Sequence, residues 1–119
     1  KLAENILILD LRKIDSSPAD FFVICTALSN SQSKAIFEEI YTTLKNEGIN
    51  IPKTEGTDSM DWILLDYFDV VVHIMSVQAR NYFKLERIWS DAKIQTIEDD
   101  KIVDFDKNLL KELYLIPTV

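Results

Sequence analysis

The sequence predicts an α/β protein in which helices pack on a mixed β-sheet. Short apolar runs with the length of strands alternate with longer segments that have helical periodicity. Two of the runs, 62–67 and 70–75, are separated by two residues and must be antiparallel, whereas links through helices allow parallel neighbours. The length of 119 residues fits one domain, 1–119, in which 99–119 is expected to be a C-terminal extension.

The N-terminal half is expected to contribute two strands and a helix. The segment 6–11 (ILILDL) predicts a first strand, and the continuous apolar run 21–27 (FFVICTA) predicts a buried strand. Ser29 and Gln32 have the spacing of a capping box, which starts a helix that is expected to end near Gly48. One face of this helix should carry Ile36, Phe37, Ile40, Tyr41 and Leu44.

The C-terminal half is expected to contribute a hairpin, a second helix and an edge strand. Residues 48–60 hold both glycines and one proline and predict a loop before the hairpin. A helix is predicted over 76–92 and an edge strand over 94–97, followed by a last helix that Asp106 caps and Pro117 ends. Four residues at helical spacing should face the core from the second helix: Leu85, Ile88, Trp89 and Ala92.

Charge and composition exclude several classes of function. The chain has 13 Lys and Arg against 20 Asp and Glu, a net charge of −7, which argues against sequence-independent binding to nucleic-acid phosphates. No apolar run approaches the ~20 residues of a membrane-spanning helix, so no membrane is expected as a partner. Cys25 is the single cysteine and lies in an apolar run, which indicates packing in a reducing, cytoplasmic compartment.

Metal binding and catalysis have little support in the sequence. His73 and Cys25 are the sole residues of their types, so zinc with its usual ligands is excluded, and no cofactor is expected. Asp66 and Asp69 straddle a turn and are poorly placed to share a magnesium ion. His73 is interpreted first as a histidine on a partly covered sheet face, second as a contact residue of a binding surface, and last as a general base.

The segment 55–69 is both acidic and aromatic and is the best candidate for a binding surface. A solvated acidic loop is the simpler interpretation. Aromatic side chains bordered by carboxylates are also typical of a surface that anchors a basic partner, because the rings supply desolvated area and the charges steer the approach. The acids are Glu55, Asp58, Asp61, Asp66 and Asp69, and the aromatic residues are Trp62, Tyr67 and Phe68.

A basic stripe is expected on the second helix. Arg80, Lys84 and Arg87 recur at helical spacing, and a solvated helix face is the favoured interpretation. Arg80 is the exception. It follows the hairpin, and we expect its guanidinium to reach Asp66 or Asp69 and hold the acidic surface in shape.

Together these residues resemble the signature of the iojap, or ribosomal silencing factor, family. The resemblance rests on 61–75 (DWILLDYFDVVVHIM), on the Arg, aromatic pair and LERIW pattern within 80–92, and on ADFFVICTA and SNSQ within 19–32. It covers most of the chain. Phe68 replaces the glycine usual in the family's turn, and Ala27 replaces the glycine usual before the capping box.

The resemblance implies a nucleotidyltransferase-like fold without catalytic residues, and no enzyme activity. It implies binding to large-subunit ribosomal protein fourteen, a block on joining of the small subunit, reduced translation, and a homodimer. Because ribosomal proteins are mostly basic, the acidic charge fits contact with such a protein instead of sequence-specific contact with RNA. The alternatives are a nucleotidyltransferase-like enzyme and an adaptor for a non-ribosomal partner. The expected partner-binding residues are Trp62, Asp66, Tyr67, Phe68, Asp69, His73, Arg80 and Tyr82.

Overall fold

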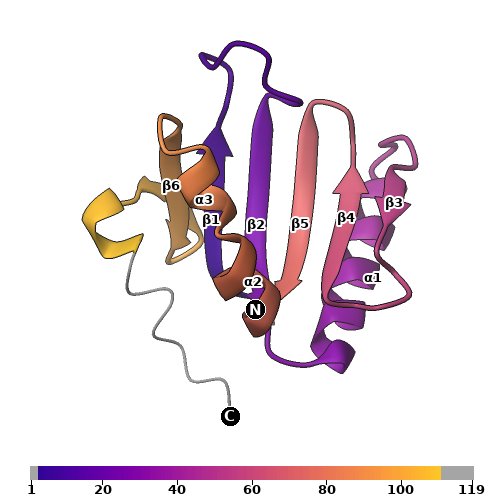
Figure 1. The fold of residues 1–119 in the computed structure, drawn as a ribbon. Coiled ribbons are helices and arrows are strands. Elements are labelled where there is room, and N and C mark those ends of the chain that lie inside the picture. Colours follow the sequence, from indigo (N-terminus) through magenta and orange to yellow (C-terminus); the bar gives the residue numbers. More distant parts are fainter. Residues whose placement is uncertain (1–2, 111–119) are drawn as a thin grey trace.

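The computed structural model describes residues 3–110, in which seven strands form one mixed sheet with three helices on its faces (Figure 1). The strands are β1 (Glu4–Asp10), β2 (Phe21–Ala27), β3 (Lys53–Glu55), β4 (Trp62–Asp66), β5 (Val70–Ser76), β6 (Lys93–Glu98) and β7 (Lys101–Asp104). The helices are α1 (Asn30–Asn46), α2 (Val77–Phe83) and α3 (Leu85–Ile88). The strand order is β3-β4-β5-β2-β1-β6-β7, which confirms the predicted fold class.

A parallel pair of strands lies at the centre of the sheet. β2 and β5 run side by side from Phe21 opposite Val70 to Ala27 opposite Ser76, and their connection passes through α1, β3 and β4. The other described neighbours are antiparallel, including the predicted hairpin of β4 and β5. Both central strands lead directly into helices, so α1 and α2 begin at the same end of the sheet.

α1 packs on one face of the sheet, over β2, β5 and β4. Ser29 Oγ accepts a hydrogen bond from the Gln32 N–H at 3.2 Å, and Gln32 Oε1 accepts one from the Leu28 N–H at 2.9 Å. The predicted cap is confirmed, although Gln32 reaches back one residue further than in the usual capping box. Beneath the helix lies a buried cluster with Phe37, Ile40 and Tyr41 at its margin: Cys25, Ala27, Ile36, Ile63, Leu65, Val72 and Ile74.

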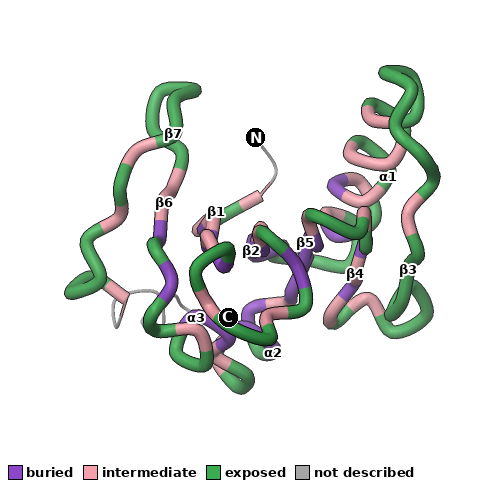
Figure 2. The backbone as a smooth tube through the Cα atoms, turned by 90° about the horizontal axis from the view of Figure 1, so that it is seen from above, coloured by how far each residue is buried: buried purple, intermediate pink, exposed green. Residues whose placement is uncertain are grey.

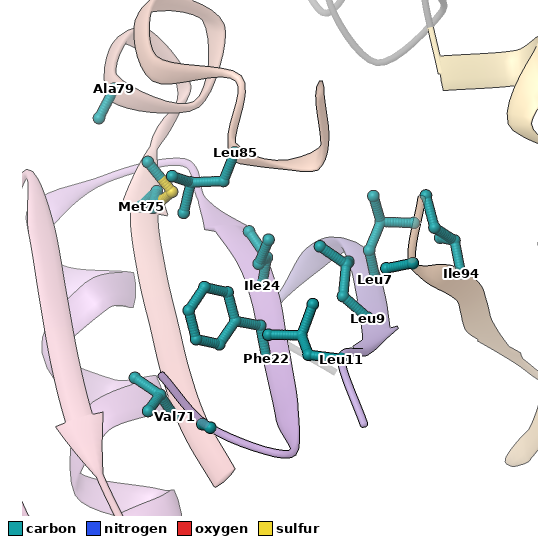
Figure 3. Close-up of a cluster of buried hydrophobic side chains, with 12 residues drawn as sticks. Leu7, Leu9, Leu11, Phe22, Ile24, Val71, Met75, Ala79, Leu85 and Ile94 are labelled. Carbon is teal, nitrogen blue, oxygen red and sulfur yellow. The ribbon is translucent and has the colours of Figure 1, made fainter. Parts of the chain in front are cut away.

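α2 and α3 pack on the opposite face. Alternation along the strands sends Phe22 and Ile24 to this side, whereas Cys25 faces α1. Trp89 packs edge-on against Phe22 with ring centroids 5.9 Å apart, as its predicted core position requires. Figure 3 shows the strand side chains converging with those of the helices: Leu7, Leu9, Leu11, Phe22, Ile24, Val71, Met75, Ala79, Leu85 and Ile94.

The prediction of one continuous helix over 76–92 is wrong, because the chain breaks at Lys84. Lys84 has a left-handed backbone with φ of 49°, which ends α2 after seven residues and starts α3 in a new direction. Leu85 and Ala92 are buried, as predicted. Ile88 was expected in the core but is 64% exposed, because α3 is a single turn that ends at this residue, so the predicted helical stripe from Leu85 to Ala92 does not form.

β6 and β7 form a hairpin at one edge of the sheet. The strand predicted over 94–97 is present as β6, but it is not the edge, because β7 pairs with it on the outside. Asp99 and Asp100 connect the two strands with φ of 50° and 63°, the left-handed pair that a two-residue hairpin turn requires. The expected C-terminal extension therefore begins with a strand of the main sheet.

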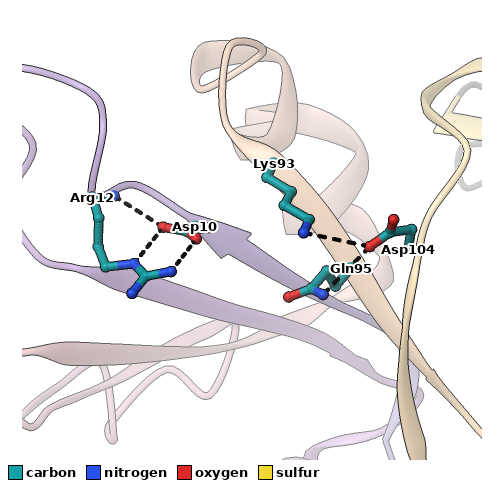
Figure 4. A network of polar contacts seen from close by, with 5 residues as sticks. All are labelled: Asp10, Arg12, Lys93, Gln95 and Asp104. Atoms are coloured by element: carbon teal, nitrogen blue, oxygen red, sulfur yellow. Dashed lines mark hydrogen bonds and ion pairs between the residues drawn. The ribbon is translucent and has the colours of Figure 1, made fainter.

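Charged contacts line β1, β6 and β7 (Figure 4). Arg12 Nε and Nη2 donate to the two carboxylate oxygens of Asp10, at 3.0 and 2.8 Å, and these bonds lower the pKa of Asp10 to about 2. Asp104 accepts a hydrogen bond from Gln95 at 3.4 Å and lies 3.8 Å from the Lys93 ammonium. Such exposed contacts add little stability, but charges near an edge disfavour its pairing with another chain.

The last predicted helix lies mostly outside the described residues. Asp106 begins a short helical turn at 107–110, where its Oδ1 accepts a hydrogen bond from the Asn108 N–H at 2.9 Å. The part of the predicted helix that approaches Pro117 falls beyond residue 110. Among residues 3–110, none of the helices combines the length and the apolar composition that a membrane span requires.

Each face of the sheet is covered over only part of its width. Among the described elements, α1 leaves β1, β6 and β7 open on its side, and α2 and α3 leave β3 and β4 open on theirs (Figure 1, Figure 2). The two open halves therefore lie on opposite faces and at opposite edges of the sheet. Figure 2 shows that exposure increases from the central strands toward β3 and β7.

Candidate protein-binding surface

An exposed aromatic cluster lies where β4 begins and α2 ends. The ring of Trp62, the first residue of β4, lies 4.6 Å from that of Phe83, which lies 4.9 Å from that of Tyr82. Trp62 is half-buried, and Tyr82 and Phe83 are 81% and 44% exposed. We call these three residues the aromatic cluster. Adjoining rings open to solvent are typical of the anchors of a protein interface.

The backbone of Trp62 is fixed by the segments beside it. Gly56 has a φ of +79°, and a Cβ at this position would lie 1.9 Å from the Trp62 carbonyl oxygen, so no larger residue fits without a shift. The Ser76 N–H donates to the Asp61 carbonyl at 2.8 Å. The start of β4 therefore holds its place although it lies near an edge of the sheet.

His73 lies beneath the aromatic cluster. It lies on the α2 side of the sheet with Val71 and Met75, but it is only 4% exposed and cannot contact a partner directly. The Trp62 indole N–H donates to His73 Nδ1 at 3.0 Å, and the Phe22 ring lies 4.5 Å from the imidazole. Burial, assisted by the charge of Arg80, lowers the pKa of His73 to about 4. The imidazole is therefore neutral at pH 7, with Nδ1 as the acceptor and the proton on Nε2.

Phe68 forms the tip of the β4–β5 hairpin and is 84% exposed. Its φ of 79° is unusual for a bulky residue. Asp66 Oδ1 accepts a hydrogen bond from the Phe68 N–H at 2.8 Å, and the Tyr67 N–H donates to the Val70 carbonyl at 2.9 Å. A strained turn that presents an aromatic ring to solvent indicates a functional position.

A hollow of about 510 Å³ lies beside the hairpin tip. Two of the residues that line it, Ile49 and Ile51, are 46% and 64% exposed. Both residues fall in the segment 48–60 that was predicted to be a loop, and the hollow was not predicted. Two isoleucines within an otherwise polar loop were the available signal. The other lining residues are Gly48, Asn50, Lys53, Asp66, Tyr67 and Phe68.

The open face of β4 connects the aromatic cluster to the hairpin tip. Trp62, Leu64 and Asp66 alternate onto the α2 side, and the four residue steps between the first and the last span about 13 Å. On β3, Glu55 pairs with Leu64 and Lys53 pairs with Asp66, so both lie on the same side. We call the combined set the β4 surface: Glu55, Trp62, Leu64, Asp66, Phe68, Asp69, Tyr82 and Phe83. Leu64 and Phe83 are the members that the sequence analysis did not single out.

Tyr67 departs from the predicted binding surface. Its side chain packs at the margin of the α1-side cluster, on the opposite face from Trp62. The phenol oxygen is buried and has no hydrogen-bond partner among the described residues, and burial raises the pKa of Tyr67. The structure thus brings Trp62 and Tyr82 into the aromatic cluster, places Asp66 on the same face of β4 and Phe68 and Asp69 at the hairpin tip, and leaves Tyr67, His73 and Arg80 away from the cluster's exposed side.

Arg80 is buried, so its predicted place in a solvated basic stripe is wrong. It is 2% exposed, its Nη1 donates to Thr26 Oγ1 at 2.8 Å, and its Nε lies 3.5 Å from Glu86 Oε1. Burial lowers the pKa of Arg80, and the buried Glu86 carboxylate opposes that shift. Arg80 lies at the end of β5 that is remote from Asp66, so the expected pairing with Asp66 or Asp69 is also wrong. Its actual role is to connect α2 with α3 and β2.

The described residues offer little for metal chemistry. No three or more His, Cys, Asp or Glu side chains within 3–110 lie close enough together to hold a metal ion. The groups that the β4 surface does present, exposed rings and carboxylates, are suited to contact with another macromolecule.

The fold and surface define a small α/β protein with an open sheet face that is acidic and aromatic. A family model described as ribosomal silencing factor during starvation matches residues 1–112. The chain belongs to the ribosomal silencing factor family, as the resemblance predicted. Family membership places it among the ribosome-associated regulators of translation.

Relatives of known name or structure support this assignment. The ribosomal silencing factor of Bacillus subtilis is 42% identical over 98 residues, which cover 82% of each chain. A crystal structure of a Chromobacterium violaceum protein, 35% identical, superposes with a TM-score of 0.69 over 74% of this chain and 72% of that one. A mouse protein named for mitochondrial assembly of the ribosomal large subunit is 27% identical over 100 residues, 82% of this chain and 42% of its own length.

Proposed function

We propose that the protein binds the large ribosomal subunit in the cytoplasm and sterically blocks joining of the small subunit, which lowers translation without catalysis. The β4 surface carries this proposal, because exposed rings bordered by carboxylates on a chain of net charge −7 fit a basic ribosomal protein. Large-subunit ribosomal protein fourteen is the partner that the family resemblance implies. The name of the mouse relative supports the choice of subunit.

The two kinds of group on this surface have separate tasks. The aromatic cluster and Leu64 supply apolar area whose removal from water stabilises the bound state. Asp66, Asp69 and Glu55 attract basic side chains and raise the association rate more than they raise the affinity. Substitution of the rings should therefore increase dissociation, and neutralisation of the acids should mainly slow association.

Cosedimentation with purified large subunits tests the surface. Tyr82→Ala and Trp62→Ala should each weaken binding by about 30-fold, which corresponds to ~2 kcal/mol. Tyr82 is 81% exposed, so its variant should keep the native melting temperature, whereas Trp62 is half-buried and needs that check. Ile88→Ala removes a similarly exposed apolar side chain from α3 and is the matched control. Binding that Tyr82→Ala and Trp62→Ala both leave unchanged would reject the surface.

Subunit joining, followed by light scattering, tests the steric block. The native protein should lower the extent of joining when it is added to large subunits before small subunits. Asp66→Asn with Asp69→Asn should weaken this inhibition, whereas Asp99→Asn with Asp100→Asn should not, since the second pair lies on the turn of the opposite edge. Equal loss of inhibition in both double variants would show that the net charge acts in general and that no localised surface is involved.

The alternative functions predict different observations. A nucleotidyltransferase-like enzyme should release or absorb heat when it is titrated with nucleoside triphosphate and magnesium, and we expect no heat. An adaptor for a non-ribosomal partner should sediment away from large subunits in a lysate gradient, and we expect comigration with them.

We also propose a homodimer through the open α1-side half of the sheet. Ile97 and Ile102 are cross-strand neighbours there, 44% and 61% exposed, and Ile8 of β1 lies on the same side. Sedimentation equilibrium should give twice the 13.8 kDa of one chain for the native protein and the single mass for Ile102→Lys. Ile88→Lys is the control. A native protein that stays monomeric at high concentration would reject the dimer.

A further inference from the structure

We infer that His73 is a positioning residue: its hydrogen bond fixes the Trp62 indole so that the indole ring completes the aromatic cluster. His73 thereby sets the affinity for the partner without touching the partner. This inference rests on the proposed function, because it explains how the β4 surface is held ready for binding. It also gives a role to a residue whose burial excludes direct contact.

The position of the indole is determined from two sides. Its Nε1–H points at His73 Nδ1 at 3.0 Å, and its ring lies 4.6 Å from Phe83 and 5.9 Å from the imidazole. Trp62 stands on a strand whose α2 side is open, where a large side chain with two rotatable bonds would otherwise sample several rotamers. A ring that is fixed before binding loses less conformational entropy when the partner arrives.

The imidazole itself is held firmly enough to act as the anchor. It is buried at the boundary between the aromatic cluster and the core, where the Phe22 ring lies 4.5 Å away at an angle of 58°. Ile24 and Leu64 are its cross-strand neighbours on the two adjacent strands. Because the imidazole is fixed, its hydrogen bond also restricts the position of the Trp62 indole.

The burial of a histidine at this position has a cost that a core role does not explain. Nε2 carries the proton, is buried, and has no hydrogen-bond partner among the described residues. A buried donor without a partner loses the hydrogen bond that it made with water in the unfolded chain, which destabilises the fold. The neighbouring core positions of β5 on the same side, Val71 and Met75, are apolar, so an aliphatic residue would fill this place more cheaply. What an aliphatic residue lacks is an acceptor for the Trp62 indole.

Two substitutions of His73 separate the hydrogen bond from the volume. His73→Leu fills most of the space and removes the acceptor. His73→Asn is smaller, but its amide oxygen can stand near the position of Nδ1 and accept the indole N–H. A positioning role predicts that the asparagine variant rescues function, although it leaves the larger cavity. A purely structural role predicts the reverse order.

The indole N–H resonance of Trp62 reports the hydrogen bond directly. The chain has two tryptophans, so a ¹H–¹⁵N spectrum shows two indole signals, and Trp89→Phe assigns them. His73→Leu should shift and broaden the Trp62 signal, and His73→Asn should leave it close to the native position. An unchanged signal in folded His73→Leu would overturn the inference, because the indole would then be fixed by other contacts.

Cosedimentation with large subunits measures the consequence for binding. His73→Leu should weaken binding about 10-fold and His73→Asn less than about 3-fold. In a Trp62→Phe background, which has no indole N–H, His73→Leu should change binding by less than about 2-fold, because the two residues act through one bond. An equal loss in both backgrounds would show that His73 acts on the fold in general, and it would overturn the inference.

The failure of this inference is distinguishable from the failure of the proposed function. If Trp62→Ala and Tyr82→Ala bind large subunits like the native protein, the docking surface is wrong whatever His73 does. If both weaken binding while His73→Leu does not, the surface stands and the positioning role is rejected. Should His73→Leu fail to fold, a comparison of His73→Asn with His73→Gln decides, since glutamine places its amide near Nε2 instead of Nδ1. Equal binding of these two would reject the role.

Discussion

Phe68 combines backbone strain with nearly full exposure, a combination that stability alone does not favour. A non-glycine residue in the left-handed region costs roughly 1 kcal/mol. Phe68→Gly should therefore be no less stable than the native protein and up to about 1 kcal/mol more stable, with the entropy of glycine in the unfolded chain opposing part of the gain. Urea unfolding measures this difference.

The same variant should bind large subunits less tightly, because it removes an exposed ring from the β4 surface. Phe68→Leu separates the two effects, since leucine keeps the strain of a positive φ but has no ring. A Phe68→Gly protein that loses both stability and binding would show that the ring packs on the hairpin and that strain is not the dominant effect.

His73 makes stability depend on pH in a defined window. Its pKa is about 4 in the folded protein, against about 6.5 for an unfolded histidine. Between these values the unfolded chain binds a proton that the folded protein does not, so the free energy of unfolding falls as pH falls through this window. The loss approaches the order of 3 kcal/mol below pH 4.

Unfolding of the native protein and His73→Asn at several pH values isolates this contribution, because both proteins share the same carboxylates. The stability of the native protein relative to the variant should fall between pH 6.5 and pH 4 and stay constant above pH 7. If the difference in free energy of unfolding between the native protein and His73→Asn does not vary with pH, the imidazole is not buried in its neutral form.

At the scale of elements, the break between α2 and α3 determines which side chains the core receives. Leu85→Ala removes a buried side chain and should cost about 2–5 kcal/mol. Ile88→Ala removes an exposed one and should stay within about 0.5 kcal/mol of the native protein. Thermal and urea unfolding of the two variants checks the burial within α3, because the predicted core stripe would make both substitutions costly.

Strands β1, β2, β4, β5 and β6 and helix α1 were predictable because local signals and tertiary packing agree there, whereas β3 lies in the predicted loop 48–60 and β7 in the expected extension. The apolar runs are as long as the strands they form, and the Ser29–Gln32 cap marks the start of α1. The break at Lys84 was not predictable, because neither glycine nor proline marks it and the helical spacing continues through it. The burial of Arg80 depends on Glu86, which reaches it only because the chain changes direction between them.

The candidate binding surface was predictable only where it is continuous in sequence. The hairpin and its acids lie within one segment, and the pattern of rings and carboxylates identified them. Phe83 joins the surface because the end of α2 returns to the start of β4, and His73 is separated from solvent by helices that pack on it. Such contacts depend on the path of the chain, which composition and spacing do not specify.

At the scale of the whole molecule, the charge of −7 should govern the encounter with a basic partner. Exposed charges are screened beyond a Debye length of ~10 Å at 0.1 M salt, so the association rate with large subunits should fall as ionic strength rises. Stopped-flow rates that stay flat between low and moderate salt would contradict this role for Asp66, Asp69 and the acids around them.

The two open halves of the sheet lie on opposite faces and at opposite edges, and this arrangement determines how many partners a dimer can bind. A pair of chains joined through their α1-side halves would carry two β4 surfaces that face away from the shared interface. Self-association and engagement of a ribosomal protein would then use different strands and would not compete. Such a pair would be bivalent, and two tethered sites rebind before either diffuses away, which lengthens residence on a dense array of partners without any additional contact in either site.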